Sequence, residues 1–274
     1  KNRFRPLSGL IKRDIIDGIK PWLFDEHILA IIGPRQAGKT SLLHLLSRLL
    51  LKEGRVKEER VYYFDLEDID FLSFFNTSSP AEIVAQFGKS TEKVFLFIDE
   101  IQYLKNPSNF LKIIHDHFPH VKLIVSGSST LEIKKRFKES LTGRKKLFVL
   151  RTLNFDEFLR FKNSPLLKIK NKLNYKTQPS FSSLQKKDFL RLFDEFVTFG
   201  GYPRVVLEEN REKKIDELSE IYNSYLRKDV KDFGAVENIE AFNKLVSLLA
   251  FQIGQLVNLE ELTLNLRLSR KTVE

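Results

Sequence analysis

The stretch Gly33-Pro-Arg-Gln-Ala-Gly-Lys-Thr40 decides the fold of this chain. It has the pattern G-x-x-x-x-G-K-[ST], in which backbone N–H groups and a lysine surround the phosphates of a nucleotide. The apolar, β-branched run 27–32 before it predicts a buried strand. The apolar spacing after it predicts a helix over 40–52 with one buried face. Strand, glycine loop and helix together therefore predict a nucleotide-binding P-loop rather than a chance glycine turn.

Each residue type in this loop has a physical role. Gly33 and Gly38 let the backbone turn so that its N–H groups point inward, and the dipole of the following helix attracts the same anion. We expect Lys39 to reach the β- and γ-phosphates of ATP and the Thr40 hydroxyl to bind Mg²⁺. The predicted nucleotide-binding residues are Gly33, Pro34, Arg35, Gln36, Ala37, Gly38, Lys39, Thr40 and Ser41.

A second motif, Val94-Phe-Leu-Phe-Ile-Asp-Glu100, predicts an apolar strand that ends in two carboxylates. Asp99 would hold Mg²⁺, directly or through water, and Glu100 would activate the attacking water as a general base. Acidic residues at a strand end can also be simple caps, but beside a P-loop they predict a Walker B site. A further predicted strand at 60–65 lies between the two motifs. It indicates the class of P-loop ATPases with a catalytic glutamate next to the magnesium aspartate.

Two more candidate groups follow along the chain. The strand predicted from Lys122 ends in small polar residues, where a sensor hydroxyl would face the γ-phosphate or the attacking water. Ser126 lies at its tip and Ser128 just beyond it, and the spacing does not choose between them. The stretch 133–146 is strongly basic. Within it, Arg144 precedes a strand at 147–150 and is our candidate for stabilising transition-state charge, in cis or across a subunit contact.

Two other polar clusters have simpler explanations. For the acidic tip 66–68 we favour helix capping by Asp68; the alternative is a carboxylate close to the phosphates, at the carboxyl ends of the strands. His115, His117 and His120 lie close together in sequence. The spacing of His115 and His117 does not put two ligands on one helix face, so we expect a solvated surface rather than a metal site.

Composition limits the classes of function. The chain has 274 residues, no cysteine and no methionine, which excludes disulfides and cysteine–zinc sites and fits a cytoplasmic location. The missing methionines lead us to expect a fragment. No apolar run approaches the ~20 residues that span a bilayer, and we expect no membrane partner. The net charge of +10 fits a nucleic-acid partner or a solvated lysine-rich surface equally well.

The rest of the chain reads as helical. Residues 10–24 predict an N-terminal helix that Pro21 ends or bends, and 163–183 predict a linker or mobile insertion. The last stretch, 256–274, predicts a helix, a turn near Arg267–Ser269 and a second helix, which is helix-turn-helix spacing. Ser269 would cap the second helix, which places Arg270, Lys271 and Thr272 at its N-terminal end. In such modules this end of the helix contacts the bases. DNA contact and protein contact stay open as alternatives.

The order of these motifs resembles a broad family of prokaryotic AAA+ ATPases related to origin-recognition and STAND-type ATPases. The resemblance rests on GPRQAGKT, FLFIDEIQYL, LIVSGSS, LTGRKKLFVLRTLNFDEF, FGGYP and the C-terminal helix-turn-helix, and it covers nearly the whole chain. It implies a parallel five-stranded sheet of order 5-1-4-3-2, a helical lid and a winged helix. The positions that match family motifs are Gly33, Gly38, Lys39, Thr40, Asp99, Glu100 and Arg144.

We therefore predict an α/β fold of the AAA+ P-loop class. The expected parts are an ATPase domain (1–162), the linker (163–183), a helical lid (184–254) and the start of a truncated winged helix-turn-helix (255–274). The predicted function is Mg²⁺-dependent ATP hydrolysis coupled to a conformational change, with ATP and ADP as ligands and a protein partner or homo-oligomer as further candidates. The alternative is a slow-turnover, nucleotide-gated switch that acts as a DNA- or protein-binding module.

Overall fold

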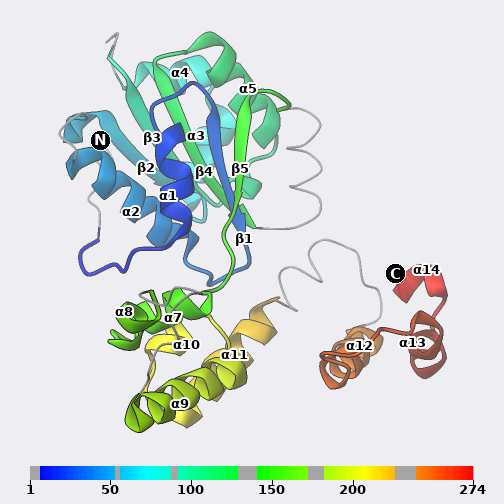
Figure 1. The fold of residues 1–274 in the computed structure, drawn as a ribbon. Helices are drawn as coiled ribbons and strands as arrows, with labels where there is room; N and C mark the ends of the chain where they lie inside the picture. The colour runs from blue at the N-terminus through cyan, green and yellow to red at the C-terminus, as the bar shows by residue number, and fades with distance from the viewer. Residues whose placement is uncertain are drawn as a thin grey trace. The chain divides into compact units, whose positions relative to one another are not determined.

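Parallel strands form the centre of the computed structural model, which describes residues 7–52, 56–87, 92–128, 141–171, 182–225 and 239–273. In this part of the chain the strands form one five-stranded sheet with the order β2-β3-β4-β1-β5 (Figure 1). Read from the other edge this is 5-1-4-3-2, so the predicted topology is confirmed. The strands are β1 (Ile28–Gly33), β2 (Val61–Asp65), β3 (Val94–Asp99), β4 (Val121–Ser128) and β5 (Lys145–Val149).

Helices cover both faces of this sheet (Figure 1). Successive residues of a strand point to opposite faces, and the strands here are apolar on both. One face packs against α1 (Ile15–Ile19) and α2 (Lys39–Lys52). The other packs against α3 (Ile69–Thr77), α4 (Pro80–Ala85) and α5 (Pro107–His117). The two buried layers fix the sheet from both sides, and all strands run in one direction, so their carboxyl ends share one edge.

Capping residues set where α3 and α4 begin. The carboxylate of Asp68 accepts hydrogen bonds from the backbone N–H groups of Asp70 and Phe71, which confirms that Asp68 caps α3. Ser79 and Glu82 form a capping box at the start of α4, in which each side chain bonds the other residue's backbone N–H. The acidic tip at 66–68 is therefore explained by local backbone bonding.

A second, all-helical core follows the sheet. It contains α7 (Phe155–Phe161), α8 (Leu166–Asn171), α9 (Ser183–Phe199) and α10 (Pro203–Leu207), which we call the α7–α10 cluster. Phe158, Leu159, Leu166 and Leu192 are buried within it. Helix α7 packs with these helices, and α8 lies within 163–183, where the sequence predicts a linker or mobile insertion. Leu166 holds α8 in this core; residues 172–181 lie outside the described residues.

The chain divides into two compact units, 1–219 and 220–274, which are considered separately. The boundary falls within α11 (Arg211–Tyr225). The second unit contains α12 (Ile239–Phe251), α13 (Leu259–Leu266) and α14 (Arg270–Val273). Arg267 adopts a left-handed conformation between α13 and α14, and the backbone N–H of Thr272 donates to the Ser269 hydroxyl. Helix, turn and cap lie where the helix-turn-helix spacing predicts them.

The N-terminal helix and strand β4 differ from their predicted bounds. The helix predicted over 10–24 covers only Ile15–Ile19, and it gives way to a 3-10 turn, η1 (Lys20–Trp22), at Pro21, where the sequence predicts an end or bend because proline lacks a backbone donor. Strand β4 continues through Ser128, so both candidate serines belong to the strand. Further 3-10 turns lie at η2 (Glu58–Arg60) and η3 (Ile101–Tyr103). Of the basic stretch 133–146, residues 133–140 lie outside the described residues.

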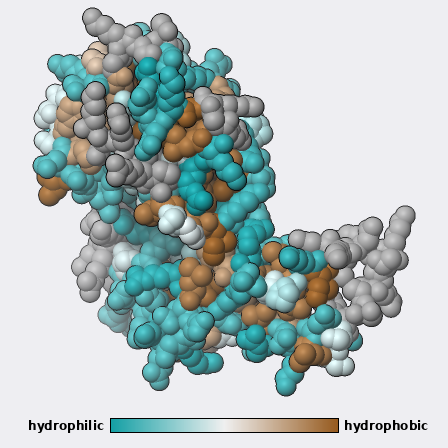
Figure 2. Space-filling view, turned by 90° about the vertical axis from the view of Figure 1, so that its left-hand side faces the viewer, coloured by the Kyte–Doolittle hydropathy of each residue, from teal (hydrophilic) through white to brown (hydrophobic). Residues whose placement is uncertain are grey.

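The surface is mixed in character. On the face drawn in Figure 2, hydrophilic side chains cover most of the surface and hydrophobic ones gather in separate patches. Leu256 and Phe251 of the second unit are among the exposed apolar side chains. None of the described helices combines the length and apolarity that a membrane span requires.

Candidate functional site

The P-loop connects β1 to α2 at the carboxyl edge of the sheet. Its backbone turns sharply: Gln36 and Gly38 have φ angles of 58° and 94°. Gly38 therefore needs the freedom of glycine. Gly33 has a different reason to be glycine, since an added Cβ would lie 2.3 Å from the carbonyl oxygen of Leu150. The chain that follows β5 runs against this glycine and donates the Leu150 N–H to the carbonyl of Ile32 at 2.7 Å.

Lys39 and Thr40, at the start of α2, point into this region. Lys39 is only 5% exposed, and its Nζ donates to the carbonyl oxygens of Gly33 and Pro34 at 3.3 Å each. Thr40 donates its hydroxyl to the Oδ2 atom of Asp99 at 2.6 Å. The helix start thus combines a cation, a hydroxyl and the positive end of the helix dipole, which together attract an anion.

Asp99, at the end of β3, is the centre of the site. Its carboxylate is 1% exposed and accepts four hydrogen bonds. Oδ2 accepts from Thr40 and from the hydroxyl of Tyr63 at 3.0 Å. Oδ1 accepts from the hydroxyl of Ser126 and from the backbone N–H of Glu100 at 3.1 Å. A buried charge needs such compensation, and these donors come from α2, β2, β4 and the next peptide.

Glu100 follows in a left-handed conformation, with φ of 53°, which costs a residue other than glycine about 1–2 kcal/mol. Its Oε1 atom lies 3.6 Å from Lys39 Nζ, and its Oε2 atom accepts a hydrogen bond from the side-chain amide of Gln102. Gln102 in turn accepts from the backbone N–H of Ser128 at 3.3 Å. The carboxylate is therefore held between the P-loop lysine and the end of β4.

The two candidate serines have different positions. Ser126 pairs with Ile31 of β1 in the sheet register, and its hydroxyl touches Asp99 and accepts from the N–H of Glu100 at 3.3 Å. Ser128 pairs with Gly33, and its backbone contacts Gln102. The structure brings the hydroxyl of Ser126, rather than that of Ser128, to the carboxylate of Asp99.

Arg144 is not brought to this site within one chain. It comes just before β5, and its carbonyl accepts the N–H of Ile28 at the amino end of β1. All strands are parallel, so this is the edge of the sheet opposite the P-loop. The guanidinium forms two hydrogen bonds with the carboxylate of Asp116, at 2.7 and 3.1 Å. They hold the pKa of Asp116 well below its usual range. A role for Arg144 in cis has no support from this position.

Tyr63 and Gln102 are site residues that the sequence patterns do not reveal. An aromatic residue in an apolar strand is typical of the core, and nothing local marks the Tyr63 hydroxyl as a ligand of Asp99. Burial, with the carboxylates of Asp99 and Asp65 close by, raises the pKa of Tyr63. The phenol therefore stays protonated and donates.

His44 packs beside the ring of Tyr63. Burial lowers the pKa of His44, and the Nδ1 atom of His44 accepts a hydrogen bond from the N–H of Leu7 at 3.2 Å.

The donor set fits a magnesium ion bound together with phosphates. Mg²⁺ prefers oxygen ligands and is usually held by one or two protein groups plus substrate phosphates. Thr40 Oγ1 and Asp99 Oδ2 are two such oxygens, 2.6 Å apart. Within the described ranges there is no cluster of three or more histidine, cysteine or acidic residues suited to a metal.

Comparison with known proteins agrees with this geometry. A family described as AAA domain matches residues 25–159, which contain all of the sheet, the P-loop and the Asp99 cluster. Residues 25–159 are thus similar to an AAA domain. A second family, described only as a domain of unknown function, matches residues 190–274.

Relatives of the chain extend across both regions. An uncharacterized protein of Methanocaldococcus jannaschii is 28% identical over 97% of this chain and 56% of its own length. An uncharacterized protein of Haemophilus influenzae is 25% identical over 85% of this chain and 53% of its own. The chain thus spans about half the length of these curated relatives. Among solved structures, the Aeropyrum pernix ORC1 protein in complex with DNA aligns with a TM-score of 0.44 at 14% identity, covering 97% of this chain and 82% of that one.

The contact between Tyr63 and Asp99 can be tested by Tyr63→Phe. Hydrogen bonds to charged groups contribute about 1.5–3 kcal/mol, so we expect the free energy of unfolding to fall by roughly that amount. Tyr62→Phe is the control, because Tyr62 packs in the layer on the other face of the sheet. Denaturant unfolding followed by circular dichroism measures both. Equal losses in the two variants would contradict the role assigned to the Tyr63 hydroxyl.

Proposed function

We propose that the AAA domain binds ATP with Mg²⁺ and hydrolyses it, and that the nucleotide state changes the conformation of the chain. The observation that carries this proposal is the meeting of Lys39, Thr40, Asp99 and Glu100 at the carboxyl edge of the sheet. Thr40 contacts Asp99 at 2.6 Å, and Lys39 lies 3.6 Å from Glu100. A cation, two magnesium-type oxygens and a second carboxylate are the groups that phosphoryl transfer to water requires.

The roles follow from the chemistry of each group. The N–H groups of the P-loop, the α2 dipole and Lys39 would hold the phosphates. Thr40 and Asp99 would hold Mg²⁺, which supplies charge neutralisation of the phosphate oxygens when bound. Glu100 would orient the attacking water and accept its proton. Ser126, which bonds both Asp99 and the backbone of Glu100, would hold these two residues in fixed positions relative to each other.

Lys39 and Glu100 should separate binding from chemistry. Lys39→Ala removes the charge that faces the phosphates, so we expect weaker ATP binding. Glu100→Gln keeps the shape but cannot accept a proton, so we expect ATP binding close to that of the unchanged protein with turnover slower by ~10²-fold or more. Equilibrium binding and steady-state phosphate release measure the two effects. An equal loss of ATP affinity in both variants would refute these roles.

Arg144 can still contribute across a subunit contact. Its side chain lies at the surface, paired with Asp116, and an exposed ion pair of this kind is readily exchanged for another anion. We propose that it stabilises transition-state charge in the site of a second copy.

We expect Arg144→Ala to lower turnover with little change in ATP affinity. Mixing it with Glu100→Gln should restore part of the activity, because one intact composite site can then form. Asp116→Asn is the control, since it releases Arg144 without removing it. Normal turnover by Arg144→Ala alone would reduce Arg144 to a surface cation.

One observation favours the second candidate, a slow nucleotide-gated switch. Both oxygens of Glu100 are engaged, one facing Lys39 and the other bonded to Gln102, so the base must be released before it can act. The partner in this case would contact the helix-turn-helix formed by α13 and α14. The second helix of this motif begins with the basic residues Arg270 and Lys271. The start of the second helix is where such modules contact DNA.

The switch predicts slow ATP turnover with or without DNA, and DNA affinity that depends on ATP. Phosphate contacts release counterions, so binding should weaken steeply between two salt concentrations. Lys271→Ala should weaken all sequences about equally if it contacts phosphate, whereas Arg270→Ala should relax sequence preference if it contacts a base. Absence of DNA binding at low salt, in both nucleotide states, would exclude DNA and favour a protein partner.

A further inference from the structure

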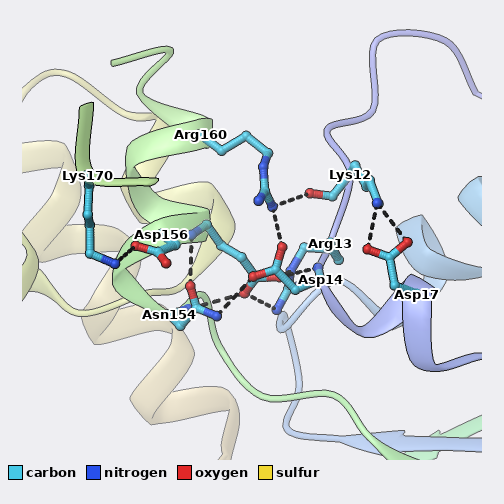
Figure 3. Close-up of polar contacts among 9 residues, drawn as sticks. Lys12, Arg13, Asp14, Asp17, Asn154, Asp156, Arg160 and Lys170 are labelled. Carbon is cyan, nitrogen blue, oxygen red and sulfur yellow. Dashed lines mark hydrogen bonds and ion pairs between the residues drawn. The ribbon is translucent and has the colours of Figure 1, made fainter. Parts of the chain in front are cut away.

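Arg13, which lies beside Asp14 and Asn154 in Figure 3, joins three separate parts of the chain next to the P-loop. It precedes α1 and is 5% exposed. Its Nη1 donates to the carbonyl oxygen of Ala37, within the P-loop, at 2.9 Å. Nη2 donates to the carbonyl oxygen of Arg151, after β5, at 2.8 Å. Nε donates to Oε1 of Glu157, in α7, at 2.9 Å. The planar guanidinium thus bonds the P-loop, the end of the sheet and the first helix of the α7–α10 cluster at once.

Glu157 is as fully engaged as Arg13. It is 4% exposed, and Nη2 of Arg13 also reaches its Oε2 at 3.3 Å, which makes the pair bidentate. The backbone N–H groups of Asp14 and Asn154 donate to the same carboxylate at 2.8 and 3.2 Å. The bond from Asn154 is half of the capping box that begins α7. One carboxylate therefore fixes both Arg13 and the first turn of α7.

The bond to Ala37 bears directly on phosphate binding. The peptide unit between Ala37 and Gly38 is planar and trans, since the described residues contain no cis bond. Holding the Ala37 carbonyl toward Arg13 therefore aims the Gly38 N–H in the opposite direction. In a P-loop this N–H is one of those that surround the phosphates. Gly38 has a φ of 94°, and a Cβ placed on it would lie 3.7 Å from Arg13 Nη1, so the guanidinium lies directly against this glycine.

The helical cluster is seated at the same place by a second contact. Gly201 packs so closely on Leu153 that an added Cβ would lie 2.2 Å from the Leu153 carbonyl oxygen, and the Leu153 N–H donates to the Gly201 carbonyl at 2.7 Å. Pro203, which begins α10, comes within 3.8 Å of the Cβ position of Gly38. A movement of the P-loop backbone at Gly38 would thus alter the contacts of both α7, through Arg13, and α10, through Pro203.

We propose that Arg13 is a positioning residue, which orients the Gly38 N–H for phosphate binding and couples the P-loop to α7 through Glu157. This inference rests on the proposed nucleotide binding. It identifies the physical link by which the nucleotide state reaches the α7–α10 cluster. The link is built from groups that cannot move independently, because the guanidinium shares its donors between Ala37 and Glu157.

The experiment compares three variants with the unchanged chain. Arg13→Lys replaces the fork with a single ammonium, which cannot hold Ala37 and Glu157 together. Glu157→Gln leaves Arg13 in place but removes the charge that ties it to α7. Arg160→Gln is the matched control: it removes the neighbouring α7 ion pair with Asp14, 2.7 Å long and more exposed, without touching the P-loop. The readouts are ATP affinity and hydrogen exchange of the α7 amides with and without ATP.

In the unchanged chain and in Arg160→Gln, we expect ATP to slow exchange at residues 155–161 by ~10-fold, within the usual range of coupling between sites. Glu157→Gln should bind ATP but lose this protection. Arg13→Lys should lose both protection and ~10-fold in ATP affinity.

ATP binding by the unchanged chain without any effect on α7 exchange would overturn the coupling and leave the proposed function intact, whether or not the variants fold. Unchanged affinity in Arg13→Lys would overturn the positioning role. Failure of the unchanged chain to bind ATP at all would overturn the proposed function and this inference together.

Discussion

Burial of the Asp99 carboxylate constrains everything around it. A charge that is almost fully removed from water is costly unless hydrogen-bond donors replace the lost solvent. Here the donors are Thr40, Tyr63, Ser126 and the peptide of Glu100. They can meet only if β3 lies between β2 and β4, with β1 and its P-loop beyond β4. The strand order is thus the framework that lets a buried charge exist at this edge.

The same arrangement creates a pair of opposite charges beside the Asp99 cluster. Lys39 and Glu100 face each other across 3.6 Å, a separation at which attraction is real but no direct hydrogen bond forms. Each is also held by a neutral partner: Lys39 by the carbonyls of Gly33 and Pro34, and Glu100 by Gln102. Such a site is organised before any ligand arrives, which lowers the cost of assembling it during binding.

Local patterns predicted the parts of this site that are local. The P-loop and the Asp99–Glu100 pair are continuous in sequence, and the position of Asp68 as a helix cap follows from its neighbours. The choice between Ser126 and Ser128 was open because both lie on the same face of β4, and only the pairing of β4 with β3 places the Ser126 hydroxyl beside Asp99. The role of Tyr63 could not be predicted from the sequence, because its ring packs in the apolar layer as a core residue would. Only the structure shows that its hydroxyl donates to Asp99. The contact between Arg13 and Glu157 joins residues with no shared local pattern.

The position of Arg144, by contrast, could have been predicted from the sequence. Once β5 is known to be parallel to β1, a residue just before β5 must lie at the amino edge of the sheet, away from the P-loop. The boundaries of the helical part were harder to predict. Phe155 to Phe161 belongs to the predicted ATPase domain in sequence, and its Phe158 and Leu159 also pack in the same core as Leu192 of α9.

The magnesium–nucleotide site proposed at Thr40 and Asp99 is tested most directly by calorimetric titration. The chain and its Asp99→Asn variant are titrated with ATP, in Mg²⁺ and in a chelator. We expect Mg²⁺ to tighten ATP binding to the unchanged chain by ~10-fold or more, equivalent to about 1.4 kcal/mol. We expect that gain to disappear in Asp99→Asn. Equal ATP affinity of the unchanged chain with and without Mg²⁺ would contradict the account.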